Sequence, residues 1–243
     1  MYIDIHAHLE LLDDFEQIIS DCADKKVHIV AAGVDVESNR KVLDISSKHD
    51  NVSCVLGLYP FSEMPSFDVD LEVDFIRSNA SKIVGIGEVG LDGTYSDELF
   101  DLQEDVFVKM IKLSLELDKF LVVHSRKAEK RVIDLLEQEG ARKVVMHCFC
   151  GPSKLVERCA KLGYYFSIPA NLSRAENFQR IVSKVSINQL LTETDSPYLA
   201  RVKGEKNTPL AVVETVSEIA KIKGFDVQET LMNLNLNWKR LNL

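Results

Sequence analysis

Short apolar runs alternate with longer amphipathic segments along the whole chain. The apolar runs are rich in Val, Ile, Leu and aromatic residues, which is typical of strands buried on both faces. Eight strands are predicted, at Tyr2–Ile5, Val27–Ala31, Val52–Gly57, Ile83–Gly87, Phe120–Val123, Lys143–Met146, Tyr164–Ile168 and Gln189–Thr192. Helices are predicted between and after them, at Asp13–Lys25, Val36–Lys48, Val69–Asn79, Ser96–Asp118, Lys127–Glu139, Ser153–Leu162, Ala175–Lys184, Pro209–Lys223 and Asp226–Arg240.

This alternation favours one architecture. Eight strands with intervening helices suit a closed parallel barrel better than an open doubly wound sheet. The chain has 243 residues, a length that α/β barrels reach as one domain, and no low-complexity segment or linker interrupts it. We therefore expect an α/β fold, a TIM-type (β/α)8 barrel, with residues 1–243 forming a single domain.

Composition and charge narrow the class of protein. A content of 46% hydrophobic and 28% charged residues is ordinary for a soluble protein with a sizeable core. No apolar run could span a bilayer, and the first ten residues carry charges and histidines where an export signal is apolar, so a cytoplasmic protein with no membrane partner is expected. The net charge of −9 argues against a protein that coats DNA, so a polyanionic substrate would be contacted locally.

The five cysteines are odd in number and widely spaced, which predicts reduced thiols rather than a disulfide framework. They are Cys22, Cys54, Cys148, Cys150 and Cys159. The pair Cys148 and Cys150 lies beside His147, an arrangement compatible with zinc. Because no second pair completes a structural zinc site, the favoured interpretation is two small apolar side chains at a strand end.

Potential metal ligands fall where the predicted strands end. They are His6 and His8 after the first strand, Glu88 after the fourth, His124 after the fifth, His147 after the sixth, and Glu193 with Asp195 after the eighth. The carboxyl ends of all barrel strands open on one face, so these residues are expected to converge on one cavity. Positions i and i+2 of an extended chain point the same way, so His6 should share a side with His8, and Glu193 with Asp195.

The chemistry of these side chains indicates divalent cations. Imidazoles with carboxylates suit zinc or manganese, and a carboxylate-rich site also admits magnesium. One ion needs about four ligands, so six good ligands would serve two ions that share a carboxylate. The other two histidines, His28 near a strand start and His49 near a helix end, are interpreted as structural.

Several motifs, in this order and spacing, resemble the TatD family of metal-dependent DNases within the amidohydrolase-like metal barrels. The resemblance runs nearly end to end. The motifs are IDIHAHL at 3–9, GIGEVGLD at 85–92, VVHSR at 122–126, MHCFCG at 146–151, TETDSPYL at 192–199 and KNTP at 206–209.

The resemblance implies a deoxyribonuclease of exonuclease-like type that uses two divalent metal ions per chain (Mg, Mn or Zn) on a DNA or nucleotide substrate. One ion would be held by His6, His8, Glu88 and Asp195, and the second by Glu88, His124 and His147, with Glu88 as the bridge. Asp195 would also orient the attacking water and accept its proton. Glu193 would act as a partner of the ligands, or as an additional base.

Substrate contacts are predicted at fewer positions. Arg126 follows His124 by two residues, so its guanidinium should face the same cavity and bind a phosphate. Relatives often carry His-Pro after the third strand, where this chain has Tyr59-Pro60, so Tyr59 would meet the phosphate through its hydroxyl. They also often carry an aromatic residue where this chain has Gly93. Lys206 and Asn207 are candidates for positioning the eighth strand.

Two other functions fit the same residues. A metal-dependent amide or ester hydrolase (lactonase, amidase or aminoacyl-tRNA deacylase) would polarise a carbonyl with the same ions, and substrate choice lies in the loops. A metal-stabilised scaffold without activity is disfavoured, because a structural site does not need six ligands around an open mouth. No obligate protein partner is indicated.

Overall fold

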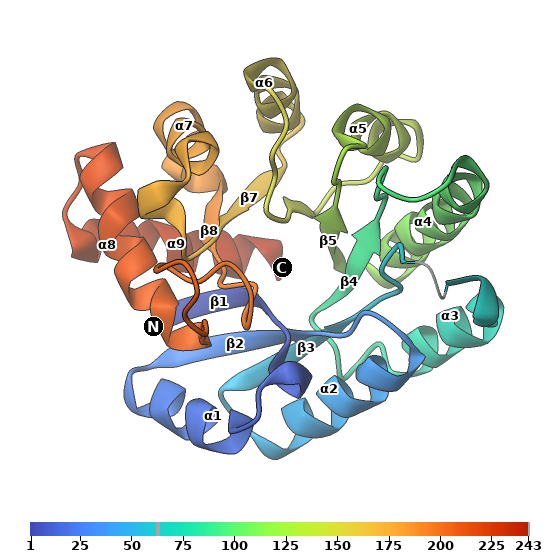
Figure 1. Ribbon diagram of the computed structural model, residues 1–243, viewed down its shortest axis with the longest axis horizontal. Helices are drawn as coiled ribbons and strands as arrows, with labels where there is room; N and C mark the ends of the chain where they lie inside the picture. The colour runs from blue at the N-terminus through green and yellow to red at the C-terminus, as the bar shows by residue number, and fades with distance from the viewer. Residues whose placement is uncertain (62–63, 243) are drawn as a thin grey trace.

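Eight parallel strands form the centre of the protein, and helices surround them (Figure 1). The computed structural model describes residues 1–61 and 64–242. The strands are β1 (Tyr2–Ala7), β2 (Val27–Ala32), β3 (Val52–Leu56), β4 (Gly85–Gly90), β5 (Phe120–His124), β6 (Val144–Met146), β7 (Tyr165–Ile168) and β8 (Leu190–Thr192). Each strand pairs in parallel with the next one along the chain, from β1 to β8.

Contacts between the first and last strands bring the sheet round into a barrel. Ala7 forms a parallel bridge with Ser196, just beyond β8. The Thr192 hydroxyl donates to the carbonyl of Ile3 at 2.5 Å, and the backbone N–H of His8 donates to Ser196 at 2.8 Å. These bonds close the ring where the β8 ladder is short, so the predicted (β/α)8 architecture is confirmed.

Most of the helices lie outside the barrel, and the last one lies behind the strands in Figure 1. They are α1 (Phe15–Asp24), α2 (Val36–Lys48), α3 (Val69–Ser78), α4 (Asp97–Leu117), α5 (Glu129–Gln138), α6 (Ser153–Lys161), α7 (Glu176–Lys184), α8 (Val212–Lys223) and α9 (Val227–Leu241). Short 3-10 turns lie at Leu9–Leu11, Met64–Ser66, Leu172–Arg174, Ile187–Gln189 and Pro209–Ala211. Among the described helices, none has the length and apolar character needed to cross a bilayer.

Two apolar layers hold the barrel together. The larger one lies between strands and helices and includes Ile29, Phe107 and Val132. A smaller cluster of alternate strand residues, including Val30 and Val122, packs with Trp238 of α9. Such alternation is what a barrel needs, because successive strand residues face its inside and its outside in turn.

Element boundaries differ from the sequence prediction at two places that matter for the site. The fourth strand runs to Gly90, which pairs with His124, so Glu88 lies inside β4 and not beyond its end. The helix predicted from Lys127 begins at Glu129, because Lys127 has a φ of 53° and cannot start a right-handed helix.

Candidate metal centre

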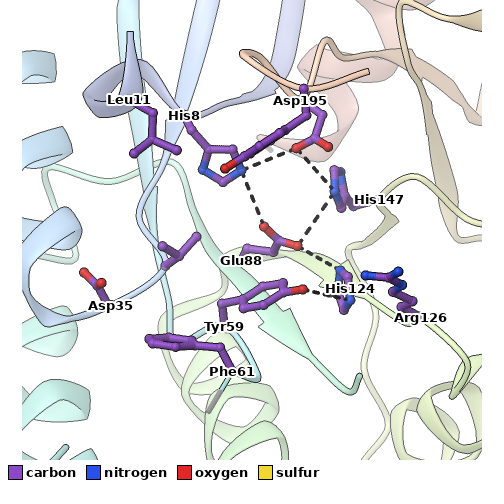
Figure 2. Close-up of a pocket in the computed structure, with 12 residues that line it drawn as sticks. His8, Leu11, Asp35, Tyr59, Phe61, Glu88, His124, Arg126, His147 and Asp195 are labelled. Atoms are coloured by element: carbon purple, nitrogen blue, oxygen red, sulfur yellow. Dashed lines mark hydrogen bonds and ion pairs between the residues drawn. The ribbon is translucent and has the colours of Figure 1, made fainter. Parts of the chain in front are cut away.

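The six predicted ligands meet at one rim of the barrel, and Figure 2 shows all of them except His6. They come from β1 and its end (His6, His8), from within β4 (Glu88), from the last residue of β5 (His124), and from just after β6 (His147) and β8 (Asp195). His6 is completely buried, whereas the side chains of His124 and Asp195 keep 14% and 16% exposure. The site is therefore enclosed but reachable from solvent.

His6 and His8 turn their rings toward one point, as the i, i+2 spacing predicts. Their Nε2 atoms lie 3.2 Å apart. Asp195 Oδ1 lies 3.6 Å from Nε2 of His6 and 3.4 Å from Nε2 of His8. Burial alone would lower the pKa of His8, but the hydrogen bond that His8 donates to Asp195 and the charges of Asp195 and Glu88 raise this pKa to about 8.

Glu88 lies at the centre, and its two oxygens face different partners. Oε2 is 3.2 Å from Nε2 of His6, while Oε1 is 3.0 Å from Nδ1 of His124 and 3.7 Å from Nε2 of His147. Burial alone would raise the pKa of Glu88, yet the charges of His147 and His6 and hydrogen bonds from His124 and His6 hold it well below its usual range. The carboxylate is therefore ionised and placed between two groups of imidazoles.

A glycine on the neighbouring strand end makes room for Glu88. A Cβ built on Gly57 would lie 2.5 Å from the Glu88 carbonyl oxygen, which is closer than real Cβ atoms approach. The Asn39 side chain fixes this glycine, since its amide bonds both the N–H and the carbonyl of Gly57 at 3.1 and 2.9 Å. A side chain at position 57 would push β4 away and displace Glu88 from the cluster.

Glu193 lies behind His147, on the far side of its ring from Asp195. Glu193 Oε2 is 2.7 Å from Nδ1 of His147, while Asp195 Oδ1 is 3.9 Å from Nε2. A carboxylate only accepts, so Nδ1–H donates and Nε2 is left facing the cluster. The prediction that Glu193 and Asp195 share one side is wrong, because Asp195 adopts a left-handed backbone with a φ of 55° that breaks the extended alternation.

Cys148 holds Glu193 from the other side. Its backbone N–H and its thiol both donate to Glu193 Oε1 at 3.0 Å. Burial would raise the pKa of Glu193, but the charge of His147 and its hydrogen bond lower this pKa to about 2. Burial and the nearby charge of Glu193 raise the pKa of the Cys148 thiol well above its usual range. The interpretation of Cys148 as a plain apolar side chain therefore misses its contact with the site. All five cysteines are free.

Asp92 contacts the His124 ring as Glu193 contacts the His147 ring, and it was not among the residues predicted from the sequence. Asp92 Oδ2 lies 3.3 Å from Nε2 of His124 and 3.3 Å from the Tyr59 hydroxyl. Asp92 is 1% exposed, and Thr94 also donates to it. A usable signal existed, since residues 88, 90 and 92 are spaced by two and face one way if the strand continues.

Tyr59 lines the cavity, but its hydroxyl is already engaged. It lies 3.3 Å from Asp92 Oδ2 and 3.3 Å from His124 Nε2, and Figure 2 shows the contact with His124. Burial beside Glu88 and Asp92 raises the pKa of Tyr59, so the phenol stays neutral and donates. The hydroxyl contacts His124 and Asp92, which itself bonds His124. A phosphate would therefore compete with Asp92 for the hydroxyl proton.

Asp4 is a second residue that sequence reasoning missed. This fully buried carboxyl accepts from the Thr194 hydroxyl at 2.5 Å, from the Thr194 N–H at 2.9 Å and from the His6 N–H at 3.2 Å. Burial raises the pKa of Asp4 well above its usual range. Asp4 joins β1 to the segment after β8, and so fixes His6 relative to Asp195.

The remaining predicted residues divide between cavity and scaffold. Arg126 lines the cavity, and its guanidinium has no hydrogen bond or ion pair with residues 1–61 or 64–242.

The other predicted residues lie outside the cavity. Asn207 is buried and donates to the carbonyls of Thr194 and Tyr198, in keeping with a positioning role. Lys206 pairs with Asp13 on the surface. His28 bonds Ser53 and packs near Trp238, and His49 pairs with Glu16.

The cluster opens into a cavity of about 450 Å³. Its walls combine the candidate ligands with Leu11, Phe61 and Tyr198, and Arg126 stands at its edge (Figure 2). Apolar and aromatic walls beside a few fixed polar groups are typical of small-molecule and nucleotide sites.

The donor set fits divalent cations. His6, His8 and Asp195 present ligand atoms within 4.8 Å of one another, and so do His6, Glu88 and His147. The Nε2 atoms of His6 and His8, 3.2 Å apart and flanked by carboxylates, are ligands of the kind that bind zinc or manganese. Glu193 bonds to the His147 nitrogen that faces away from Glu88, and Asp92 does the same for His124. His124 joins through Glu88 and lies outside these compact groups.

Metal binding should release protons from this site. Burial would lower the pKa of His147, but the charges of Glu193 and Glu88 raise it to about 10. The pKa of His8 is about 8. Without bound metal, both imidazoles are therefore protonated at neutral pH. Ions bind neutral imidazole, so apparent affinity should rise roughly tenfold per pH unit for each ligand still protonated. Calorimetry in buffers of different ionisation enthalpy, from pH 6 to 8, measures this. Affinity independent of pH, without proton release, would contradict it.

A closed parallel barrel with converging histidines and carboxylates at the carboxyl-end rim defines a class, the metal-dependent hydrolases. The sequence profile described as TatD related DNase matches residues 3–242. The chain therefore belongs to the TatD family of metal-dependent hydrolases, and the resemblance noted in its motifs is confirmed.

Individual relatives agree with this assignment. The chain is 33% identical over 233 residues to an uncharacterised metal-dependent hydrolase of Methanocaldococcus jannaschii, covering 94% of this chain and 91% of that one. It is 30% identical over 249 residues to the human deoxyribonuclease TATDN3, covering 94% and 90%. The crystal structure of YjjV, a TatD homologue from Escherichia coli, superposes with a TM-score of 0.89 at 23% identity, covering 99% of this chain and 97% of that one.

Proposed function

We propose that this protein is a deoxyribonuclease that hydrolyses phosphodiester bonds with two divalent cations, in an exonuclease-like manner. His6, His8, Glu88 and Asp195 would hold one cation, and Glu88, His124 and His147 the other. When bound, the cations supply Lewis acidity to the phosphoryl group and lower the pKa of water. The human relative named a deoxyribonuclease, which shares 30% identity, supports this choice of substrate.

The observation that carries the proposal is the Arg126 guanidinium, which makes no hydrogen bond or ion pair with residues 1–61 or 64–242. It stands at the edge of a cavity rich in carboxylates, and no described carboxylate pairs with it. An exposed arginine with no described partner, in the same cavity as Asp195 and Glu88, fits an anionic substrate because its planar fork matches two phosphate oxygens. With a net charge of −9, the protein would contact DNA only locally, at an end or a short single strand.

Asp195, Glu193 and Asp92 have different roles in the proposed reaction. Asp195 Oδ1 faces three imidazoles, so its second oxygen is available to orient water and accept a proton. Glu193 and Asp92 fix the rings of His147 and His124 through the nitrogens that face away from Glu88. We place Glu193 as a partner that positions His147, since its two oxygens are occupied by His147 and Cys148.

The test compares substrates with and without metal. Protein stripped with a chelator and reloaded with Mg²⁺, Mn²⁺ or Zn²⁺ is assayed on single- and double-stranded DNA, bis(p-nitrophenyl) phosphate, and neutral carboxylic esters and amides. We expect the stripped protein to be inactive and the reloaded protein to cleave DNA and the diester. Turnover of esters or amides alone would move the function to carbonyl hydrolysis, and full activity after exhaustive stripping would overturn the metal mechanism.

The same assay on Arg126→Ala separates anionic from neutral substrates. The variant should lose about 10²-fold in kcat/KM on phosphodiesters, the usual cost of one charged transition-state contact. Any turnover of neutral esters should change little. Arg142→Ala is the matched control, because no described ion pair or cavity near the cluster involves it.

A further inference from the structure

A second cavity, of about 560 Å³, opens on the other side of Arg126. It shares His124, Arg126, His147 and Asp195 with the first cavity, so the two meet at the metal cluster. Its remaining walls come from the segments that follow β5, β6, β7 and β8. A phosphodiester bound at the cluster would therefore have space on both of its ester sides.

Asn171 brings to this cavity a buried side-chain acceptor with no partner among residues 1–61 and 64–242. It follows β7, is 7% exposed, and lines the cavity. Its side-chain oxygen Oδ1 is buried and accepts no hydrogen bond from any described residue. An unsatisfied buried acceptor is uncommon and costs free energy. Oδ1 is itself shielded from solvent, so a rotation of the Asn171 amide toward a ligand that donates to it would recover this cost.

The surroundings of Asn171 suit a nucleobase. Ala175, Phe178 and Leu199 give the cavity an apolar wall, against which a flat ring could pack. The amide of Asn171 offers one acceptor and two donors, which match the polar edge of a base. Lys127 lines the same cavity without a described ion pair and could meet a flanking phosphate, although the Glu129 carboxylate also lines it.

We propose that this second cavity binds the nucleoside on one side of the scissile phosphodiester, with Asn171 hydrogen-bonding the edge of its base. The first cavity then holds the nucleoside on the other side. The inference rests on the proposed phosphodiesterase function and adds to it a base-binding subsite and a specificity-determining residue.

Abasic dinucleotides test this assignment. The substrates are thymidylyl-thymidine (TpT) and two analogues in which one base, on the 5′ or the 3′ side, is replaced by an abasic ring. Asn171→Ala should lower kcat/KM on TpT by about tenfold, the cost of losing hydrogen bonds to a bound base. It should do the same on the analogue that keeps the base in the second cavity, and leave the other analogue unaffected.

Two outcomes overturn the subsite. An equal loss on all three substrates would mean that Asn171 acts on folding or on the cluster, and no loss on any would mean that it does not meet a base. If Asn171→Ala fails to fold, Asn171→Asp has the same size and keeps acceptors but not donors. Asn233→Ala, at a half-buried position of α9 that lines neither cavity, is the matched control.

A binding measurement keeps the subsite separate from the reaction. Dissociation constants for TpT and both analogues are measured by calorimetry with Ca²⁺ in place of an activating ion. Weaker binding of Asn171→Ala, restricted to the same two ligands, supports the subsite even if no substrate is cleaved, in which case only the proposed hydrolysis fails. Unchanged binding of all three ligands would overturn the subsite.

Discussion

Replacing Glu88 with glutamine is expected to reduce phosphodiester hydrolysis by about 10³-fold or more and to lower the metal content of the purified protein. Glu88 is the residue whose two oxygens face two groups of imidazoles, at 3.2 Å from His6 and 3.0 Å from His124. Glutamine keeps the shape but loses the charge and one acceptor. Steady-state kinetics and elemental analysis of the same preparation measure both effects.

Glu98→Gln is the matched control, because Glu98 is exposed in the first turn of α4 and lines neither cavity at the cluster. It should retain wild-type metal content and rate. If Glu88→Gln kept full metal-dependent activity, the two-cation mechanism would be wrong.

Changing Asp195 to asparagine is expected to slow the reaction by roughly 10²–10³-fold while most of the metal is retained. Asparagine still presents an oxygen toward His6 and His8, where Asp195 Oδ1 lies at 3.6 and 3.4 Å, but it cannot accept a proton. The loss should therefore appear in kcat more than in KM. Metal content and the pH dependence of kcat are measured alongside.

Asp24→Asn, at an exposed position in the last turn of α1, controls for the change of charge. A metal-free Asp195→Asn protein would show that Asp195 matters as a ligand and not as a base. An unchanged kcat would remove it from the reaction. The two variants thus separate holding the cations from moving the proton.

Much of the barrel could be predicted because its strands are buried on both faces. Runs such as Phe120–Val123 and Val27–Ala31 are apolar apart from His28, and the structure places β5 and β2 there with a shift of one residue at the end. Errors arose where backbone geometry departs from the average. β4 continues through a glycine-rich stretch to Gly90, and α5 starts two residues late because Lys127 is left-handed.

The candidate ligands could be predicted for a topological reason, whereas their partners could not. Every strand of a parallel barrel ends at the same rim, so histidines at strand ends converge whatever the helices between them do. Asp92 and Cys148 act through contacts to His124 and Glu193, residues 32 and 45 positions away. The spacing of two from Glu88 puts Asp92 on the side of the ligands, but the contacts themselves depend on rotamers and on the turn at each strand end, for which a single sequence carries little signal.

The sequence by itself determined the order of strands and helices, the family, and the set of side chains able to bind metal at one rim. These follow from hydrophobic periodicity and from motif spacing, which are local properties of the chain. Only the tertiary structure decided that Glu193 lies behind His147, that Tyr59 bonds Asp92, and that Asn171 faces a second cavity. Those relations join residues from different strand ends, so they exist only once the barrel has closed and each loop has set the direction of its side chains.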